Sequence, residues 1–221
     1  MQLYPSANVP ESRILRAHWA IQANFVATTL RKKLAGFTMR LMRKIVLSLG
    51  ISLDGYIARP DGAVDFLFMP KDYSMASFFA AVDTVVMGRK TLEAGLKLSG
   101  GTLPAMSMAY FVFSHSKPPG KCEGWTFVNE SLAAFIAKLR KRPGKNIWLM
   151  GGGELARDFL QADLVDELHL CIIPVLLGEG IPLFLAGFPQ RDFSLIENKS
   201  YSQGMVALKY KRLRTKGKGE A

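Results

Sequence analysis

The chain has 221 residues, of which 49% are hydrophobic and 21% are charged. It is therefore long enough to bury a sizeable core, and its composition is that of an ordinary globular protein. No apolar run approaches the ~20 residues that a membrane-spanning helix needs. The two cysteines, Cys122 and Cys171, lack the spacing of a metal site or of a disulfide framework, so we expect no bound metal and a reducing cytoplasm.

The formal net charge of +11 belongs to the two ends of the chain. Residues 1–44 contain eight Lys or Arg and one acidic residue, and residues 209–221 contain six and one. Between these ends, fifteen basic residues are balanced by sixteen acidic ones. Because basic ends are usually solvated tails, we expect no nucleic-acid partner.

The same pattern divides the chain into three parts. Residues 1–41 are a basic, acid-poor extension with a loose helical stripe, and Met42 is a candidate for the natural start of the protein. N-terminal sequencing of the native protein tests that start. Residues 42–213 carry the regular pattern of one domain, and residues 214–221 form a basic tail.

From Lys44 onward, short apolar runs that are typical of buried strands alternate with amphipathic stretches that are typical of helices. The predicted strands are 44–51, 84–87, 110–113, 125–128, 147–150 and 165–173. The predicted helices cover 74–82, begin after Gly88, follow a cap at Asn129 or Ser131, and follow Gly153. Two final strands, 193–199 and 205–212, flank a Ser-Gln-Gly turn. This order predicts an α/β fold with a mainly parallel sheet, helices on both faces and an antiparallel hairpin at one edge.

Three consecutive glycines, Gly151, Gly152 and Gly153, separate a predicted strand from a predicted amphipathic helix. Glycines at this point let a ligand approach bare main chain, and the free N–H groups of the following helical turn favour a phosphate. The alternative is a tight turn without a ligand. The spacing matches neither the common dinucleotide fingerprint nor the nucleoside triphosphate loop.

Three more polar clusters follow predicted strands: Ser52–Gly55, Gly88–Thr91 and Ser114–Ser116. In an open parallel sheet, ligands bind at the carboxyl ends of the strands, so we expect these clusters to meet the three glycines. Arg89 and the serine hydroxyls could hold an additional phosphate, which favours NADP over NAD. A solvated arginine at a helix start is the alternative for Arg89.

The candidate acid and base groups are few. Asp54 and Asp72 are the carboxylates best placed to face a pocket, although a turn-forming role and a helix-start role are the simpler alternatives. His115 follows a strand without a partner acid, which is typical of a polar edge residue. No Ser/His/Asp set occurs at a known spacing, so hydrolysis through a nucleophile is disfavoured.

Together these motifs resemble the dihydrofolate reductase-like superfamily, and more closely a stand-alone member of the branch that contains the reductase domain of the bacterial riboflavin-biosynthesis deaminase-reductase. The resemblance covers residues 42–212 and rests on five motifs in order: Ser52–Ala58, Val85–Thr91, Val112–Ser114, Met150–Gly153 and Pro174–Phe184. It implies a three-layer fold and an NADPH-dependent reductase that transfers hydride directly to its substrate without a metal.

The resemblance also implies roles for individual residues. Asp72 lies sixteen residues before Gly88, where folate enzymes have the acid that binds the pterin, and Asp54 is a second candidate catalytic group. Gly151 and Gly152 would be joined by a cis peptide bond. The cofactor-binding residues would be Gly50, Ile57 and Ala58 at the nicotinamide, Arg89, Lys90 and Thr91 at the phosphates, Ser114 at the ribose 2′-phosphate, and Gly151, Gly152 and Gly153 at the diphosphate. Gly88, His115, Glu154 and Leu155 would also bind the cofactor.

The substrate implied is a small planar heterocycle such as a pteridine or pyrimidine, and by analogy the protein is a homodimer. Residues 174–184 and Glu154 fit the riboflavin-pathway branch better than a folate enzyme. The His-x-Glu and Pro-Cys-x-x-Cys motifs of a zinc deaminase are absent from the sequence. Two alternatives stay open, a true dihydrofolate reductase and a nucleotide-binding protein without catalytic activity.

Overall fold

A computed structural model describes residues 42–102, 107–122 and 124–214 of the chain. The predicted extension, residues 1–41, and residues 215–221 of the predicted tail lie outside the described residues. Among the residues that are described, no helix is long and apolar enough to cross a membrane.

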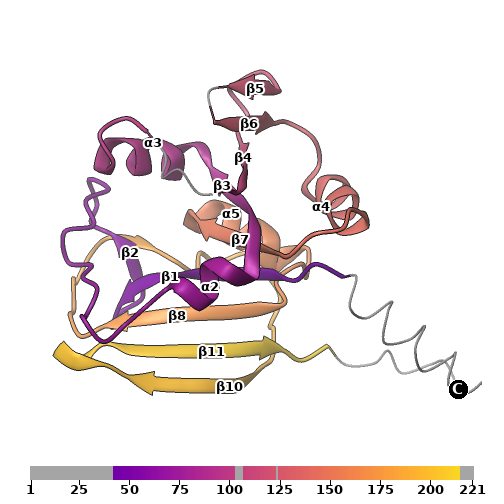
Figure 1. The fold of residues 1–221 in the computed structure, drawn as a ribbon. Coiled ribbons are helices and arrows are strands. Elements are labelled where there is room, and N and C mark those ends of the chain that lie inside the picture. The colour runs from indigo at the N-terminus through magenta and orange to yellow at the C-terminus, as the bar shows by residue number, and fades with distance from the viewer. Residues whose placement is uncertain (1–41, 103–106, 123, 215–221) are drawn as a thin grey trace, which may run out of the picture. The chain divides into compact units, whose positions relative to one another are not determined.

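One large sheet organises the described residues (Figure 1). Its strands are β1 (Ile45–Ser52), β3 (Val82–Gly88), β4 (Ala109–Phe113), β5 (Gly120–Cys122), β6 (Trp125–Val128), β7 (Asn146–Gly151), β8 (Glu167–Ile173), β10 (Phe193–Ser200) and β11 (Val206–Arg212). The spatial order is β10-β11-β8-β1-β7-β3-β4-β6-β5. The pairs from β8 through β6 are parallel, whereas β10, β11 and β5 pair antiparallel. The predicted mainly parallel sheet with a C-terminal hairpin is confirmed.

Helices cover both faces of the sheet, as predicted. On one face, α4 (Leu132–Lys141) and α5 (Gly153–Gln161) pack against alternate residues of β1 and β7 such as Leu47 and Leu149. On the other face, α3 (Arg89–Leu98) packs on Val85 and Met87, and α2 (Ala76–Ala81) places Phe78 against Trp148. This alternation places a buried apolar layer on each side of the central strands.

Some element boundaries differ from the prediction. The helix predicted over 74–82 is shorter, and its C-cap, Val82, already begins β3. Ser131, one of the two predicted caps, accepts a hydrogen bond from the Ala134 N–H (3.3 Å) at the start of α4. Two short strands were not predicted: β5, and β9 (Ile181–Pro182), which pairs with β2 (Tyr56–Ala58). Strands of two or three residues are too short to show a period.

A buried arginine joins three strands at the amino end of the sheet. Arg43, whose side chain is 5% exposed, forms an ion pair with Asp83 and donates to the Lys145 carbonyl oxygen (2.7 Å). A Cβ atom on Gly144 would lie 2.6 Å from the Asp83 carboxylate, so only glycine fits beside this pair. The arginine therefore fixes the start of β3 and β7 relative to the residue that precedes β1.

Asp166 holds together the two ends of the described fold. Its carboxylate accepts a hydrogen bond from the Ile45 N–H (2.8 Å), from Arg140 (2.5 Å) and from Arg214 (2.7 Å). Arg214 belongs to the predicted basic tail, and yet its guanidinium is engaged by Asp166 and by the Asp163 carbonyl oxygen. The first strand and the residue two positions beyond the last strand are therefore anchored on one carboxylate.

Glu167, next along the chain, is a buried carboxylate on the face that α2 covers. It accepts hydrogen bonds from Lys44 (2.7 Å) and pairs with His169 (3.1 Å). The hydrogen bond with His169, followed by the bond and charge of Lys44, lowers the pKa of Glu167 to about 2 despite its burial.

We predict that Glu167→Gln lowers the free energy of unfolding on the order of 2–3 kcal/mol at pH 7. Because the folded-state pKa lies below the ordinary value of 4.5, the stabilisation is present above about pH 4.5 and is lost as the pH falls toward 2. Urea unfolding of both proteins at several pH values measures this difference. Glu130→Gln, in an exposed pair with Lys138, is the control and should change stability by less than about 0.5 kcal/mol. A Glu167→Gln deficit that is constant from pH 7 to pH 2.5 would contradict the role of the carboxylate charge.

Candidate functional site

The carboxyl ends of β7, β3 and β4 bring together three of the predicted polar clusters. In the parallel register, Met87 lies opposite Gly151 and Gly88 lies opposite Phe113, which precedes Ser114. The Thr91 hydroxyl donates to the Gly151 carbonyl oxygen (3.3 Å), so the start of α3 contacts the turn before α5. Two helix starts from distant parts of the sequence therefore lie side by side.

The glycine turn uses backbone conformations that other residues rarely adopt. Gly151 and Gly152 have φ values of 110° and 88°, and Gly152 is the N-cap residue of α5. The expected cis peptide bond between them is wrong, because no cis peptide bond occurs among the described residues. Two successive positive φ angles make the turn instead.

The start of α5 offers unused hydrogen-bond donors. The first helical N–H groups, those of Gly153, Glu154 and Leu155, have no partner within the helix. They add to the positive end of the helix dipole. Across from them, no atom lies within 4 Å of the point where a Cβ on Gly88 would stand. The space beside Gly88 is therefore not filled by packed side chains.

Gly153 has a packing role that was not predicted. A Cβ at this position would lie 2.5 Å from the Pro182 carbonyl oxygen. Residue 182 belongs to the segment 174–184, which also pairs with β2, and the Leu183 N–H donates to the Gly55 carbonyl oxygen (3.0 Å). The last motif of the resemblance thus supports the glycine turn from the side. The same segment makes a second close approach at Gly180, whose Cβ would lie 2.5 Å from the Ala58 carbonyl oxygen.

The charges around the turn are exposed and partly paired. Arg89 contacts Glu93 one turn along α3 (2.5 Å), and Lys90 lies 3.8 Å from Glu154. Exposed pairs of this kind contribute little stability, so both cations can exchange their partner for a ligand anion at small cost. Glu154 is the one acidic residue in the first turn of α5.

Ser114 is buried at the end of β4, beside this group. Its hydroxyl oxygen accepts from the N–H groups of Ser116 (3.3 Å) and Lys117 (3.2 Å), and the loop after β4 therefore curls around it. His115 is exposed, and its ring makes no hydrogen bond within the described part of the chain. The structure thus brings Ser114 to the glycine site and leaves His115 at its solvent side.

The carboxylate of Asp54 holds the loop at Leu177 and Gly178 through hydrogen bonds. It accepts from the Ser52 hydroxyl (2.5 Å) and from the N–H groups of Leu177 (3.0 Å) and Gly178 (2.8 Å). The Ser52 hydrogen bond, with smaller contributions from both N–H groups, lowers the pKa of Asp54. An ionised carboxylate with these bonds favours the simpler alternative of a turn-forming residue and does not favour a proton donor.

Asp72 lies in a turn four residues before α2 and not on the helix itself. Its carboxylate accepts from the Ser202 N–H (3.0 Å) and hydroxyl (2.6 Å) in the turn between β10 and β11. The Ser202 hydroxyl is also the main cause that lowers the pKa of Asp72. The carboxylate therefore ties the segment before α2 to the terminal hairpin, a partner that sequence reasoning did not predict.

The three residues expected at the nicotinamide lie at the end of β1 and on β2. Ala58 is buried and Ile57 is half-buried, and Ile57 packs at the margin of the core under α5. Leu67 covers Gly50, since its terminal methyl would lie 3.0 Å from a Cβ at that position. The contact involves only the end of a flexible side chain, so it can yield to a ligand.

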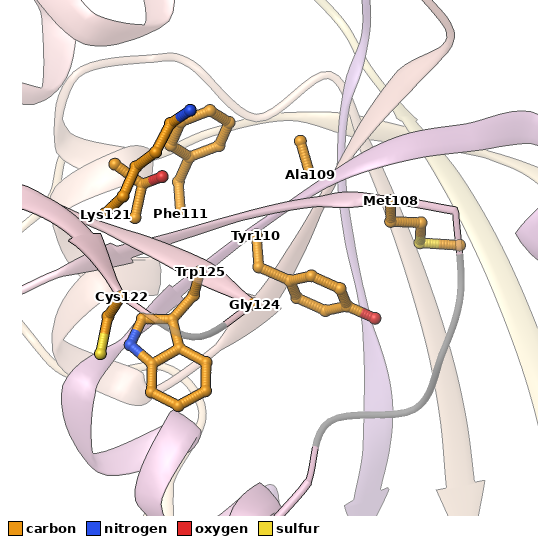
Figure 2. Close-up of a pocket in the computed structure, with 9 residues that line it drawn as sticks. Met108, Ala109, Tyr110, Phe111, Lys121, Cys122, Gly124 and Trp125 are labelled. Atoms are coloured by element: carbon orange, nitrogen blue, oxygen red, sulfur yellow. The ribbon is translucent and has the colours of Figure 1, made fainter.

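Two surface pockets lie elsewhere in the described residues. Figure 2 shows one at the amino ends of β4 and β6, lined among others by Tyr110, Trp125 and Cys122. It is at the opposite end of these strands from Ser114 and contains no group of convergent charges. A second shallow pocket borders Val128 and Asn129 at the end of β6. No group of three or more metal-ligating side chains occurs in the described ranges. The candidate site is therefore the open glycine turn, and neither pocket replaces it.

With this geometry established, comparison with known proteins identifies the family. The family model of the RibD C-terminal domain matches residues 43–207. The chain belongs to this family. The uncharacterized protein YwjB of Bacillus subtilis (strain 168) is 40% identical over 173 residues, which cover 77% of this chain and 98% of that protein.

Solved structures share the fold. A Shewanella sp. PV-4 protein, provisionally described as a riboflavin biosynthesis protein, is 30% identical with a TM-score of 0.67, over 78% of this chain and all of that one. The deaminase/5-amino-6-(5-phosphoribosylamino)uracil reductase of Thermotoga maritima has a TM-score of 0.62 at 15% identity, over 80% of this chain and 58% of that one. Enterococcus faecalis dihydrofolate reductase complexed with NADP(H) has a TM-score of 0.54 at 17% identity, over 77% of this chain and 97% of that one. The resemblance stated from the motifs is confirmed.

We predict that Gly153→Ala destabilises the protein by about 1–3 kcal/mol, because the new methyl group meets the Pro182 carbonyl oxygen. Gly95→Ala is the matched control within α3, where no atom lies within 4 Å of the new methyl group. It should stabilise the protein by up to about 1 kcal/mol, since alanine is the better helix former. Thermal and urea unfolding measure both changes. Equal effects of the two substitutions would mean that the 174–184 segment does not press on the glycine turn.

Proposed function

We propose that this protein is an NADPH-dependent reductase that transfers a hydride to a small planar heterocycle, such as a pteridine or a pyrimidine. The observation that carries the proposal is the meeting of two glycine-led helix starts, through Thr91 and Gly151, at the carboxyl ends of adjacent parallel strands. Membership of the RibD C-terminal domain family supports a reductase of the riboflavin-pathway type.

The described residues fit a dinucleotide. The N–H groups at the start of α5 and the open space beside Gly88 suit a diphosphate, which binds well at helix N-termini. Arg89 and Ser114, on the neighbouring strand ends, suit the additional phosphate that distinguishes NADP from NAD. When bound, the nicotinamide would supply the hydride. The solved dihydrofolate reductase with this fold is complexed with NADP(H), which supports the same choice of cofactor.

The chain's own residues would bind and orient the reactants. The diphosphate would lie against Gly152 and the first turn of α5. The additional phosphate would lie beside Arg89 and would take the place of Glu93 as its partner. The sheet order then leads from β4 through β3 and β7 to Gly50 on β1. The substrate would lie next to β1, under the segment that carries Leu67.

The two alternative functions predict different results in an assay of NADPH oxidation. A true dihydrofolate reductase oxidises NADPH with dihydrofolate, and a nucleotide-binding protein binds NADPH without transferring hydride to any acceptor. Isothermal titration with NADPH, followed by NADPH oxidation with pterins, ribosylaminopyrimidines and quinones, separates the three. Absence of NADPH binding would reject the proposed function.

We predict that Arg89→Ala weakens NADPH binding by about tenfold or more, since one charge-assisted hydrogen bond is worth about 1.5–3 kcal/mol. NADH binding should change much less, because NADH lacks the phosphate that Arg89 would contact. The control is Lys97→Ala, which removes a cation from the last turn of the same helix. Titration of both cofactors measures the difference. Equal losses for NADPH and NADH would show that Arg89 does not contact the additional phosphate.

We also propose a homodimer that forms through β10, with the protein in a reducing compartment. β10 is an edge strand of eight residues whose Leu195 and Ile196 are about half exposed, and such an edge pairs readily with another strand. Cys122 and Cys171 are free thiols, in keeping with reducing conditions.

We predict that Ile196→Lys yields a monomer in light scattering, whereas Leu98→Lys, at an exposed residue of α3, leaves the dimer intact. A monomeric wild-type protein would reject the dimer.

A further inference from the structure

A phenol and a thiol meet beside the end of β1, and neither has a role in the site described above. Cys171 lies opposite Gly50 in the parallel β1–β8 register, so both residues face the same side of the sheet. The Cys171 thiol donates a hydrogen bond to the Tyr73 hydroxyl oxygen (3.3 Å). The Tyr73 hydroxyl is thus held one strand away from the position where the nicotinamide is proposed to lie.

Tyr73 is fixed from two more directions. Its ring packs edge-on against Tyr201 at a centroid distance of 5.0 Å. The preceding residue, Asp72, is bonded to Ser202 in the same turn. The terminal hairpin therefore orients a side chain that belongs to the segment before α2, and orientation of this kind is what a binding group needs.

The hydrogen-bond inventory leaves one donor unused. A phenol has one hydrogen and can also accept, and here the thiol occupies the oxygen as an acceptor. Apart from the Cys171 sulfur, which is a weak acceptor, no acceptor for the Tyr73 hydrogen occurs among the described residues. Asp54 and Asp72, the two carboxylates predicted to face the site, already accept hydrogen bonds from other donors.

We propose that the Tyr73 hydroxyl, oriented by Cys171 and Tyr201, is the hydrogen-bond donor that binds the substrate ring next to Gly50. The inference rests on the proposed function, because the proposed position of the nicotinamide at Gly50 defines where the substrate lies. A phenol donor binds a carbonyl oxygen or ring nitrogen, whereas a carboxylate in the same place would bind N–H groups. Burial raises the pKa of Tyr73, so the hydroxyl keeps its hydrogen at physiological pH.

The test is to titrate 2,4-dioxopteridine into protein saturated with NADP⁺. The fluorescence of this probe reports its binding. We expect Tyr73→Phe to raise the dissociation constant of this probe about tenfold, the loss expected for one hydrogen bond at the upper end of the neutral range. Tyr201→Phe, which keeps the ring contact and lacks a bond to Cys171, should leave it within about twofold. NADP⁺ affinity should be unchanged in both variants.

Cys171 is a positioning residue in this proposal. Cys171→Ala should weaken binding of the probe. Cys171→Ser should restore most of the affinity, because its hydroxyl can also donate to the phenol. Unchanged thermal unfolding midpoints would show that the variants fold normally.

Two outcomes overturn the inference while leaving NADP⁺ binding intact: wild-type affinity in Tyr73→Phe, or no binding of the probe to the wild type. If Tyr73→Phe keeps the affinity and Asp72→Asn loses it, the role passes to the carboxylate of Asp72. If the wild type does not bind NADP⁺, the proposed function fails first and this inference fails with it.

Discussion

The candidate site depends on the parallel pairing of β3 with β7. The pairing places Met87 opposite Gly151, and so the chain leaves both strands at the same level and enters two helices side by side. Thr91 then bonds to the Gly151 carbonyl oxygen across sixty positions of sequence. A shift of one residue in this pairing would turn the side chains of β7 to the opposite face of the sheet and separate the two helix starts. The geometry of the candidate site is therefore a consequence of strand register.

Much of the fold could be predicted because its strands are continuous apolar runs. Ile147 and Leu149 on one face and Trp148 and Met150 on the other are all packed, which is the signature of a parallel strand covered on both sides. The sequence pattern did not predict β9, which has two residues and depends on its pairing with the distant strand β2. It also overextended α2, since Val82 has a β conformation although its apolar side chain fits a helical stripe.

The site was predicted where it is made of backbone, and less so where it depends on tertiary partners. A glycine between a strand and a helix can be recognised from the local sequence, so the turns at Gly88 and Gly152 were predicted. Asp72 was assigned by counting from Gly88, but its partner Ser202 lies in the terminal hairpin, and no local pattern links the two. Tyr73 and Cys171 escaped notice for the same reason, since a hydrogen bond across ninety-eight positions leaves no trace in spacing.

Asp166 has a consequence for how this fold is used in longer chains. One carboxylate holds the first residue of β1 and a residue just beyond β11, at the amino ends of the central strands, far from the glycine turn. A domain joined at either of these anchored ends would therefore attach on the side away from the candidate site. Such a fusion would leave the strand ends that form the glycine turn unchanged.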